Sequence, residues 1–308
     1  MGLKHAAVPG QKVGAVLVTG ASGALGRRVL EMLVEGRHGS VVAATRHPEK
    51  LRDLEARGVV LRQADFDQPA SLAAAFAGVE RLLLISTDAL GQPGRRFAQH
   101  QAAIAAAKKA KVAHVVYTSI VRPEAGSPVL LAADHRQTEE ALAASGMHFT
   151  VLRNNLYAEN LLMALPHALA TGVLASATGG GAAAYALRDD CARAAASVLA
   201  AKHAKRGVFD ITGSVALTHA QIAALVSRAS GRRVVAQEVP VAQVAAALGG
   251  FGLPPAAAAE LASIDLGIAQ GYFATITHAA SDLTGRVPHG AADFLAARVP
   301  SLLAGVER

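Results

Sequence analysis

The sequence predicts an α/β protein built on a doubly wound parallel sheet, with a smaller, mainly helical C-terminal domain. Three observations support this prediction. Strand-like and helix-like segments alternate through the first half of the chain, and repeated βα units imply right-handed crossovers between parallel strands. A glycine-rich turn separates the first predicted strand from the first predicted helix. After Arg153 the alternation gives way to Ala- and Gly-rich segments and then to helical patterns.

The predicted strands of the first half are short, apolar and rich in β-branched residues. Such runs are typical of parallel strands that helices cover on both faces. The first run, AVLVT, directly precedes the glycine-rich turn. The strands predicted in order are residues 15–19, 41–45, 59–62, 81–86, 114–118 and 149–152.

The helices between these strands show apolar residues at helical spacing and residues that favour helix ends. Pro48 begins one helix and Gly58 follows its end, as the preferences of these residues for helix termini predict. Asp134 with Gln137 predicts a capping box at the start of another helix. The predicted helices are residues 25–35, 48–57, 69–77, 95–111 and a helix that begins at 134.

The second half predicts a return to the sheet followed by a helical region. Residues 189–202 read as a helix and residues 207–211 as a strand. The later predicted helices span 218–229, 241–248 and 256–266. We expect residues 1–154, with the 187–213 segment returning to them, to form the larger domain. Residues 155–186 and 214–308 are expected to form a smaller, substrate-binding domain.

Cysteine content and hydropathy exclude several classes of protein. Cys191 is the only cysteine among 308 residues, which excludes an intramolecular disulfide and argues against a Cys-built metal site. The histidines lack metal-ligand spacing, so we expect no metal. No apolar run reaches the roughly 20 residues that a membrane helix needs. We therefore expect a cytoplasmic protein without a membrane span.

The charge pattern argues against a nucleic-acid-binding protein. The net charge of +7 is spread along the chain, and aromatic residues make up only 4%, so stacking platforms for bases are scarce. We attribute the basic character to solubility and to the steering of anions. A phosphorylated cofactor fits this charge equally well.

The strongest motif is the turn TGASGALG at residues 19–26. It follows a predicted strand and opens a predicted helix, as a dinucleotide-binding fingerprint requires. In this pattern Gly20 allows the tight turn, Gly23 lets the backbone approach a pyrophosphate, and Gly26 lets the helix pack closely on the strand. The GxxGxxG spacing is typical of short-chain dehydrogenases. We interpret it as a Rossmann-type cofactor site, with a merely structural turn as the alternative.

The end of the second predicted strand favours NADPH over NADH. An NAD site has an acidic residue there for the ribose 2′-hydroxyl, whereas this chain has Arg46 and no acid before Glu49. The guanidinium group presents a planar fork that suits a 2′-phosphate. The alternative is an arginine that is simply solvated after a strand.

Residues after the third and fourth predicted strands are expected to line the same cleft. Asp65 and Phe66 follow the third strand, where the adenine usually lies, although Asp65 has an equally good interpretation as a turn residue. Ser86, Thr87 and Asp88 follow the fourth strand. Ligands of such sheets bind beyond the carboxyl ends of the strands.

The sequence lacks the Tyr-x-x-x-Lys pair that most short-chain dehydrogenases use for proton transfer. In that pair the lysine lowers the tyrosine pKa. No lysine lies between Lys111 and Lys202, where the catalytic helix is expected. The residues four positions after the four tyrosines are Val121, Leu161, Asp189 and Ile276.

Other polar residues remain near the expected cleft. His135 begins the helix that would carry the missing pair, and its usual pKa suits proton donation near neutral pH. It is equally well interpreted as a half-exposed histidine, which the helix dipole would keep neutral. Asn154 and Tyr157 either fix the nicotinamide and the substrate or cap the next helix. Ser119, after the fifth strand, is expected to contact the cofactor.

Several longer segments carry a family resemblance. They are VTGASGALG (18–26), ATRHPEK (44–50), VVLRQADF (59–66), GVERLLLIS (78–86), HVVYTS (114–119), LAADHRQTEEALAASG (131–146), FTVLRNNLYAEN (149–160) and DLGIAQG (265–271). With these segments the chain resembles the NmrA-like atypical short-chain dehydrogenases. Within that family it is most similar to type 2 NAD(P)H:quinone oxidoreductases, with triphenylmethane reductase as a near relative.

The resemblance implies a Rossmann domain, a small C-terminal domain and a cofactor cleft between them. It also assigns contacts by position, with Arg46 at the 2′-phosphate and residues 86–88 on the nicotinamide side. Tyr185 falls where the family lines its substrate pocket, at a position where relatives usually have a small residue. The other implied cofactor contacts are Gly20, Ala21, Ser22, Gly23, Ala24, Leu25, Asn154, Asn155, Leu156, Tyr157, Ala158 and Glu159.

The resulting expectation is an NADPH-dependent reductase that transfers a hydride to a quinone or a similar flat electrophilic acceptor. Quinone reduction fits the missing Tyr–Lys pair, because a quinone accepts a hydride readily and water or His135 can protonate the product oxygen. One alternative is a redox sensor that binds NADP(H) without turnover. Another is a reductase of cationic dyes or imines. An apolar helix face can form a dimer surface or belong to the core, so a homodimer stays an open expectation.

Overall fold

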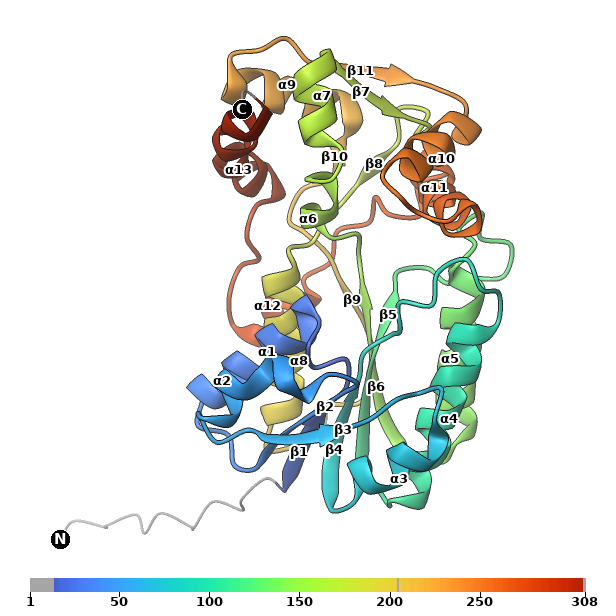
Figure 1. The fold of residues 1–308 in the computed structure, drawn as a ribbon, viewed down its shortest axis with the longest axis vertical. Coiled ribbons are helices and arrows are strands. Elements are labelled where there is room, and N and C mark those ends of the chain that lie inside the picture. Colours follow the sequence, from blue (N-terminus) through green and yellow to red (C-terminus); the bar gives the residue numbers. More distant parts are fainter. Residues whose placement is uncertain (1–13, 204, 307–308) are drawn as a thin grey trace, which may run out of the picture.

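The computed structural model describes residues 14–203 and 205–306. Among these residues, a seven-stranded parallel sheet runs in the order β3-β2-β1-β4-β5-β6-β9 (Figure 1). The order reverses beside β1, as in a doubly wound sheet. This confirms the predicted fold class. The strands are β1 (Ala15–Val18), β2 (Val41–Thr45), β3 (Val60–Gln63), β4 (Val79–Leu84), β5 (His114–Ile120), β6 (His148–Asn154) and β9 (Gly207–Ile211).

Helices cover both faces of this sheet, as parallel strands with crossover helices require. Helices α1 (Ala24–Glu35) and α8 (Arg188–Ala200) pack on one face. Helices α3 (Pro69–Phe76), α4 (Arg95–Lys109) and α5 (Ala132–Ala144) pack on the other. The connection between β2 and β3 contains a 3-10 turn, η1 (Pro48–Leu51), and α2 (Arg52–Glu55).

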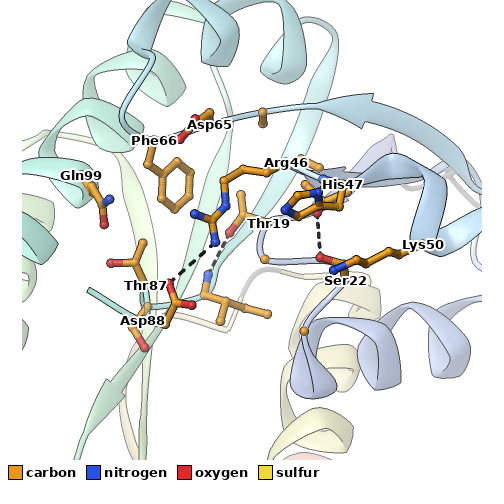
Figure 2. Close-up of a pocket in the computed structure, with 17 residues that line it drawn as sticks. Thr19, Ser22, Arg46, His47, Lys50, Asp65, Phe66, Thr87, Asp88 and Gln99 are labelled. Carbon is orange, nitrogen blue, oxygen red and sulfur yellow. Dashed lines mark hydrogen bonds and ion pairs between the residues drawn. The ribbon is translucent and has the colours of Figure 1, made fainter. Parts of the chain in front are cut away.

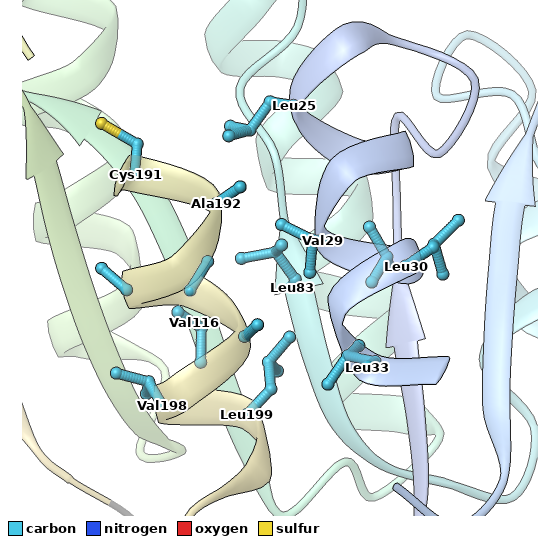
Figure 3. Packing of buried hydrophobic residues seen from close by; sticks show 14 of the residues in the cluster. Leu25, Val29, Leu30, Leu33, Leu83, Val116, Cys191, Ala192, Val198 and Leu199 are labelled. Atoms are coloured by element: carbon cyan, nitrogen blue, oxygen red, sulfur yellow. The ribbon is translucent and has the colours of Figure 1, made fainter. Parts of the chain in front are cut away.

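The core clusters follow the two-residue period of the strands. Val16 and Val18 of β1 belong to the cluster under α1 and α8, whereas Leu17 between them belongs to the cluster under α3 and α4. Figure 3 shows α8 packed side by side with α1, with Val29 and Leu33 facing its alanine-rich surface. Small residues on α8 let the two helices approach closely while both cover the sheet.

The remaining elements form a second region, drawn in the upper part of Figure 1. It contains two short pairs of strands, β8 with β10 and β7 with β11. The elements are α6 (Ala158–Leu161), α7 (Leu165–Thr171), β7 (Val173–Ser176), β8 (Ala182–Ala183), β10 (Leu217–Thr218), α9 (His219–Ser230), β11 (Val235–Glu238), α10 (Val241–Gly250), α11 (Pro255–Ala269) and α13 (Ala291–Val306).

Several local expectations differ from the structure. The capping box at Asp134 and Gln137 is wrong, because α5 begins two residues earlier and Asp134 lies within its first turn. A capping box forms instead between Thr218 and Gln221 at the start of α9. The patterns also missed four helices. Three of them are short, since α6, α7 and α12 (Ala279–Thr284) have only four, seven and six residues, and α13 contains Pro300.

The predicted domain division stays a prediction, but the packing of its parts is clear. Strand β9 pairs with β6, and α8 packs on α1. Helix α12 joins the same cluster through Ala280 and Leu283, although it lies within the segment expected in the smaller domain. Residues 1–13 of the expected larger domain lie outside the described residues. No helix of the described part of the chain is long and apolar enough to cross a membrane.

Acidification should destabilise the protein through His100 on α4 and His114 on β5. Both imidazoles are buried, and burial lowers their pKa from 6.5 to about 3 and about 4 respectively. Below pH 6.5 the unfolded chain therefore binds protons that the folded chain does not. The free energy of unfolding should fall as the pH drops from 7 to 5, by up to about 1.4 kcal/mol per pH unit for each histidine.

Urea denaturation at pH 7, 6 and 5 measures this loss. The variant His114→Gln removes one of the buried imidazoles, so its stability should depend less steeply on pH than that of the wild type. His203 is exposed, and His203→Gln serves as the control. Equal slopes for His114→Gln and the wild type would contradict the assignment.

Candidate functional site

A cavity of about 390 Å³ lies at the carboxyl ends of the central strands (Figure 2). Residues that follow β1, β2, β3 and β4 all contribute to its wall, as expected for ligand sites of doubly wound sheets. The lining residues are Thr19, Gly20, Ser22, Gly23, Ala44, Thr45, Arg46, His47, Lys50, Ala64, Asp65, Phe66, Ile85, Ser86, Thr87, Asp88 and Gln99.

The glycine turn has the geometry that its sequence predicts. Gly20 has a φ of +57°, a left-handed conformation that favours glycine. Its carbonyl oxygen accepts a hydrogen bond from the Gly23 backbone N–H at 2.9 Å. A Cβ atom on Gly26 would lie 2.5 Å from the same carbonyl oxygen. The absence of a side chain at Gly26 therefore lets α1 pack directly against the turn.

The N-terminus of α1 is open toward an anion. Gly23 is the residue that caps the helix, no described side chain caps it, and its first turn contains no acidic residue. The first N–H groups of a helix have no partners within the helix and favour negative charge. Of the motif residues, Thr19, Gly20, Ser22 and Gly23 line the cavity. Ala21 and Leu25 are buried beneath them, and Ala24 is exposed beside them.

Basic side chains gather at the wall after β2. Arg46 is half-exposed and extends across the cavity toward Asp88, with a nitrogen 3.9 Å from the carboxylate (Figure 2). The turn η1 brings Lys50 to the same wall, beside His47. The Thr45 hydroxyl ties this wall to the glycine turn, because it lies 2.8 Å from the Ser22 hydroxyl.

The opposite wall is formed by the backbone that leaves β4. The backbone N–H groups of residues 85, 86 and 87 each donate a hydrogen bond to a side chain. The acceptors are, in that order, Thr19 Oγ1 at 3.0 Å, Thr118 Oγ1 at 3.0 Å and His100 Nε2 at 3.1 Å. These side chains thus accept the hydrogen bonds that the backbone of a neighbouring strand would otherwise accept. As a result, the backbone of residues 85–87 is held in place where β4 ends.

Asp65 lies on the cavity wall and also makes a turn interaction, while its contact with an adenine stays a prediction. The residue lines the cavity beside Phe66. Its carboxylate also accepts the backbone N–H of Asp67 at 3.0 Å, which is a typical turn interaction. Gln99 on α4 reaches the same part of the wall, and no local signal in the sequence indicated it.

The structure places His135 inside the protein rather than on the cavity wall. Its Nδ1 lies 2.8 Å from the Tyr117 hydroxyl, and its side chain is buried. Burial, with a smaller effect of the nearby Arg96 charge, lowers the His135 pKa well below its usual range. The expected pKa near neutrality is therefore wrong, because a residue at the start of a helix is here covered by neighbouring elements.

Asn154 and Tyr157 contact each other after β6. The Asn154 amide nitrogen donates to the Tyr157 hydroxyl at 3.0 Å, and Arg188 stacks over the tyrosine ring. Burial raises the Tyr157 pKa, so its hydroxyl stays protonated near neutral pH. Asn154 Oδ1 is buried and has no hydrogen-bond partner among the described residues. A buried acceptor without a partner marks a place where a further polar group fits.

Other predicted site residues have partners within the fold and do not line the described cavity. The Glu159 carboxylate accepts the first backbone N–H of α8, from Arg188. The Asn155 side chain donates to the Phe273 carbonyl, and the Ser119 hydroxyl donates to Glu139. Leu156, Ala158 and Tyr185 pack in or against the apolar cluster of the second region. Their contact with a cofactor or substrate stays a prediction.

The acidic residues nearest to metal-ligand geometry in the described chain are occupied by basic partners. Asp189, Asp190 and His289 place their ligand atoms close together. However, Asp189 already accepts from Arg28 and Arg193 at 2.5 and 2.7 Å, and Asp190 accepts from His289. These carboxylates therefore already have protein partners, and the absence of a metal stays a prediction.

Sequence comparison identifies the chain's relatives. Residues 12–283 match the model of the NmrA-like family. Quinone oxidoreductase 2 of Escherichia coli is 42% identical over 257 residues, which cover 83% of this chain and 88% of that protein. NAD(P)H azoreductase of Xenophilus azovorans is 28% identical, with coverage of 91% and 96%.

Solved structures agree with these relatives. The E. coli NADPH-dependent quinone oxidoreductase 2, in complex with NADPH, superimposes with a TM-score of 0.85 at 39% identity. The alignment covers 92% of this chain and 99% of that one. The triphenylmethane reductase of Citrobacter, in complex with NADP(H), gives a TM-score of 0.83 at 29% identity, with coverage of 92% and 99%.

The contact between Gly26 and the glycine turn can be tested by adding one methyl group. We expect Gly26→Ala to lower the free energy of unfolding by about 1–3 kcal/mol, because its Cβ meets backbone that cannot move away. Gly249 in α10 has nothing within 4 Å of an added Cβ. Gly249→Ala should be neutral or stabilise by about 0.5–1 kcal/mol. Chemical denaturation of both variants measures the difference, and equal effects would show that the close contact is absent.

Proposed function

The chain belongs to the NmrA-like family, and we propose that it is an NADPH-dependent reductase that transfers a hydride to a quinone or a similar flat electrophilic acceptor. One observation carries the proposal. A single cavity combines a glycine turn at an uncapped helix N-terminus with the basic group Arg46, His47 and Lys50. The 42% identity to E. coli quinone oxidoreductase 2 supports the same reading.

The residues of the cavity fit NADPH. Residues 20–23 and the N-terminus of α1 would hold the pyrophosphate. Gly26 makes this possible, because a side chain there would collide with the turn and push the helix N-terminus away. Arg46 would hold the 2′-phosphate, with Lys50 adding positive charge beside it. Asp65 and Phe66 would face the adenine, and Ser86, Thr87 and Asp88 would lie toward the nicotinamide.

Bound NADPH would supply the hydride, so the chain's own residues need only orient the partners and exclude water. A quinone needs little acid–base help, because its reduced oxygen is weakly basic. This agrees with the absence of a Tyr-x-x-x-Lys pair from the sequence. We assign the final proton to water, since the imidazole of His135 is neutral and buried.

Tyr157 is the remaining candidate for direct contact with the reacting groups. Its hydroxyl accepts from Asn154 and keeps its own proton available to donate. The unpartnered Asn154 Oδ1 is an acceptor of the kind that a carboxamide N–H would fill. Cytoplasmic location, the absence of nucleic-acid binding and a homodimeric state stay predictions.

The first test is the oxidation of NADPH, followed at 340 nm, with a panel of acceptors. The panel contains benzoquinones, menadione, a triphenylmethane dye and an azo dye. We expect turnover with at least one quinone and little turnover with NADH. Tight NADPH binding without turnover on the whole panel would instead favour a sensor of the NADP(H) ratio.

The second test is the variant Arg46→Ala. Loss of a charge-assisted contact of about 1.5–3 kcal/mol should raise the Kd of NADPH by about 10- to 100-fold and change that of NADH little. Arg136 on α5 is paired with Glu140 on the surface, so Arg136→Ala serves as the control. Equal weakening of both cofactors by Arg46→Ala would remove the 2′-phosphate assignment.

A further inference from the structure

A buried ion pair joins α4 to α11 beside the cavity. The Arg96 guanidinium and the Glu260 carboxylate lie 3.5 Å apart, and their side chains are 4% and 12% exposed. Removing two charges from water is costly, and such a pair often stabilises a fold no better than apolar residues would. Arg96 also lies in the first turn of α4, where a positive charge opposes the helix dipole. The pair therefore has no evident benefit for α4 itself.

Arg96 and His100 hold the backbone of Thr87 from both sides. Arg96 Nε donates to the Thr87 carbonyl oxygen at 3.1 Å, and His100 Nε2 accepts the Thr87 N–H at 3.1 Å. The two side chains are one turn apart on α4. The Thr138 hydroxyl lies 2.9 Å from the other ring nitrogen of His100. Because Nε2 accepts, Nδ1 carries the proton, and the ring is fixed in one tautomer.

Glu260 fixes a second point of the loop that joins β4 to α4, residues 85–94. Its Oε2 accepts the backbone N–H of Gly91 at 2.5 Å. Gly91 has a φ of +67°, and a Cβ there would lie 2.5 Å from the backbone nitrogen of Ala257. The loop therefore sits directly against the first turn of α11. One carboxylate thus binds the loop at Gly91 and, through Arg96, at Thr87.

We propose that Arg96 and Glu260 are positioning residues that hold the Thr87 wall of the cofactor cavity in place from α11. This inference rests on the proposed NADPH-dependent function. Thr87 lines the cavity, and a wall that is already ordered costs less to bind. If the wall is released, only a fraction of the molecules is competent to bind NADPH, and the apparent Kd equals the intrinsic Kd divided by that fraction. Cofactor affinity then depends on a helix outside the cavity.

The test separates positioning from stability by replacing both charges. In Arg96→Met/Glu260→Leu no buried charge is left unpaired, although the Gly91 N–H and the Thr87 carbonyl oxygen lose their partners. The variant should therefore fold, with a Tm close to that of the wild type. The matched control is Arg136→Met/Glu140→Leu, which removes an Arg–Glu pair from the surface of α5. For each protein we would measure the Tm without ligand, the Kd of NADPH, and kcat and KM with a quinone.

We expect the double variant to raise the Kd and KM for NADPH about tenfold, which corresponds to ~1.4 kcal/mol. Its kcat at saturating NADPH should stay within about twofold, because NADPH binding reorders the wall. The amide of Thr87 should also exchange faster with solvent. A loss of fold alone would lower kcat through the active fraction and leave the Kd of the folded molecules unchanged.

The milder variant Glu260→Gln keeps an acceptor for Gly91 and removes the charge opposite Arg96. It should raise the Kd of NADPH about threefold, and it provides the test if the double variant does not fold. Wild-type affinity in a folded double variant, or in Glu260→Gln, would overturn the positioning role. A wild-type protein that does not bind NADPH would overturn the proposed function itself.

Discussion

The close contact between Gly26 and the Gly20 carbonyl is the constraint on which the site depends. Because no side chain separates them, α1 begins at the edge of the sheet and points its first N–H groups at the cavity. The same position lets Val29 and Leu33 reach the core beside α8 (Figure 3). A methyl group at Gly26 would push α1 outward. The helix would then lose both the position of its first N–H groups at the cavity and its packing beside α8, because protein cores are too densely packed to adjust to such a shift. Ligand binding and core packing thus share one backbone contact.

The sheet and most of the cavity could be predicted, because their signals are local. Hydrophobic runs gave the strands, and the glycine spacing with Arg46 indicated the cofactor wall. Lys50 and Gln99 were missed because their place at the cavity depends on the path of η1 and on the packing of α4. The pKa of His135 was wrong for a related reason. Burial by elements distant in sequence sets that pKa, and helix position alone does not reveal such burial.

Buried polar groups around the parallel sheet act mainly on the backbone. Thr19, Thr118 and His100 accept three consecutive N–H groups after β4. Tyr117 and His135 pair with each other away from the cavity wall. Buried groups that satisfy one another in this way make one backbone course more favourable than its alternatives. The buried hydroxyl and imidazole groups therefore hold the backbone that forms the cavity wall. This agrees with the proposed hydride transfer, which needs little acid–base catalysis.

The position of β9 at the edge of the sheet has a consequence for synthesis of the chain on the ribosome. Residues 155–206 separate β6 from β9, so the open edge of β6 has no partner while they are being made. An unpaired edge can join with another chain, and partly folded chains are prone to aggregate. Helix α8, which covers the face beside α1, also emerges late. Completion of the nascent sheet thus depends on a segment that is translated after α6, α7, β7 and β8 of the second region.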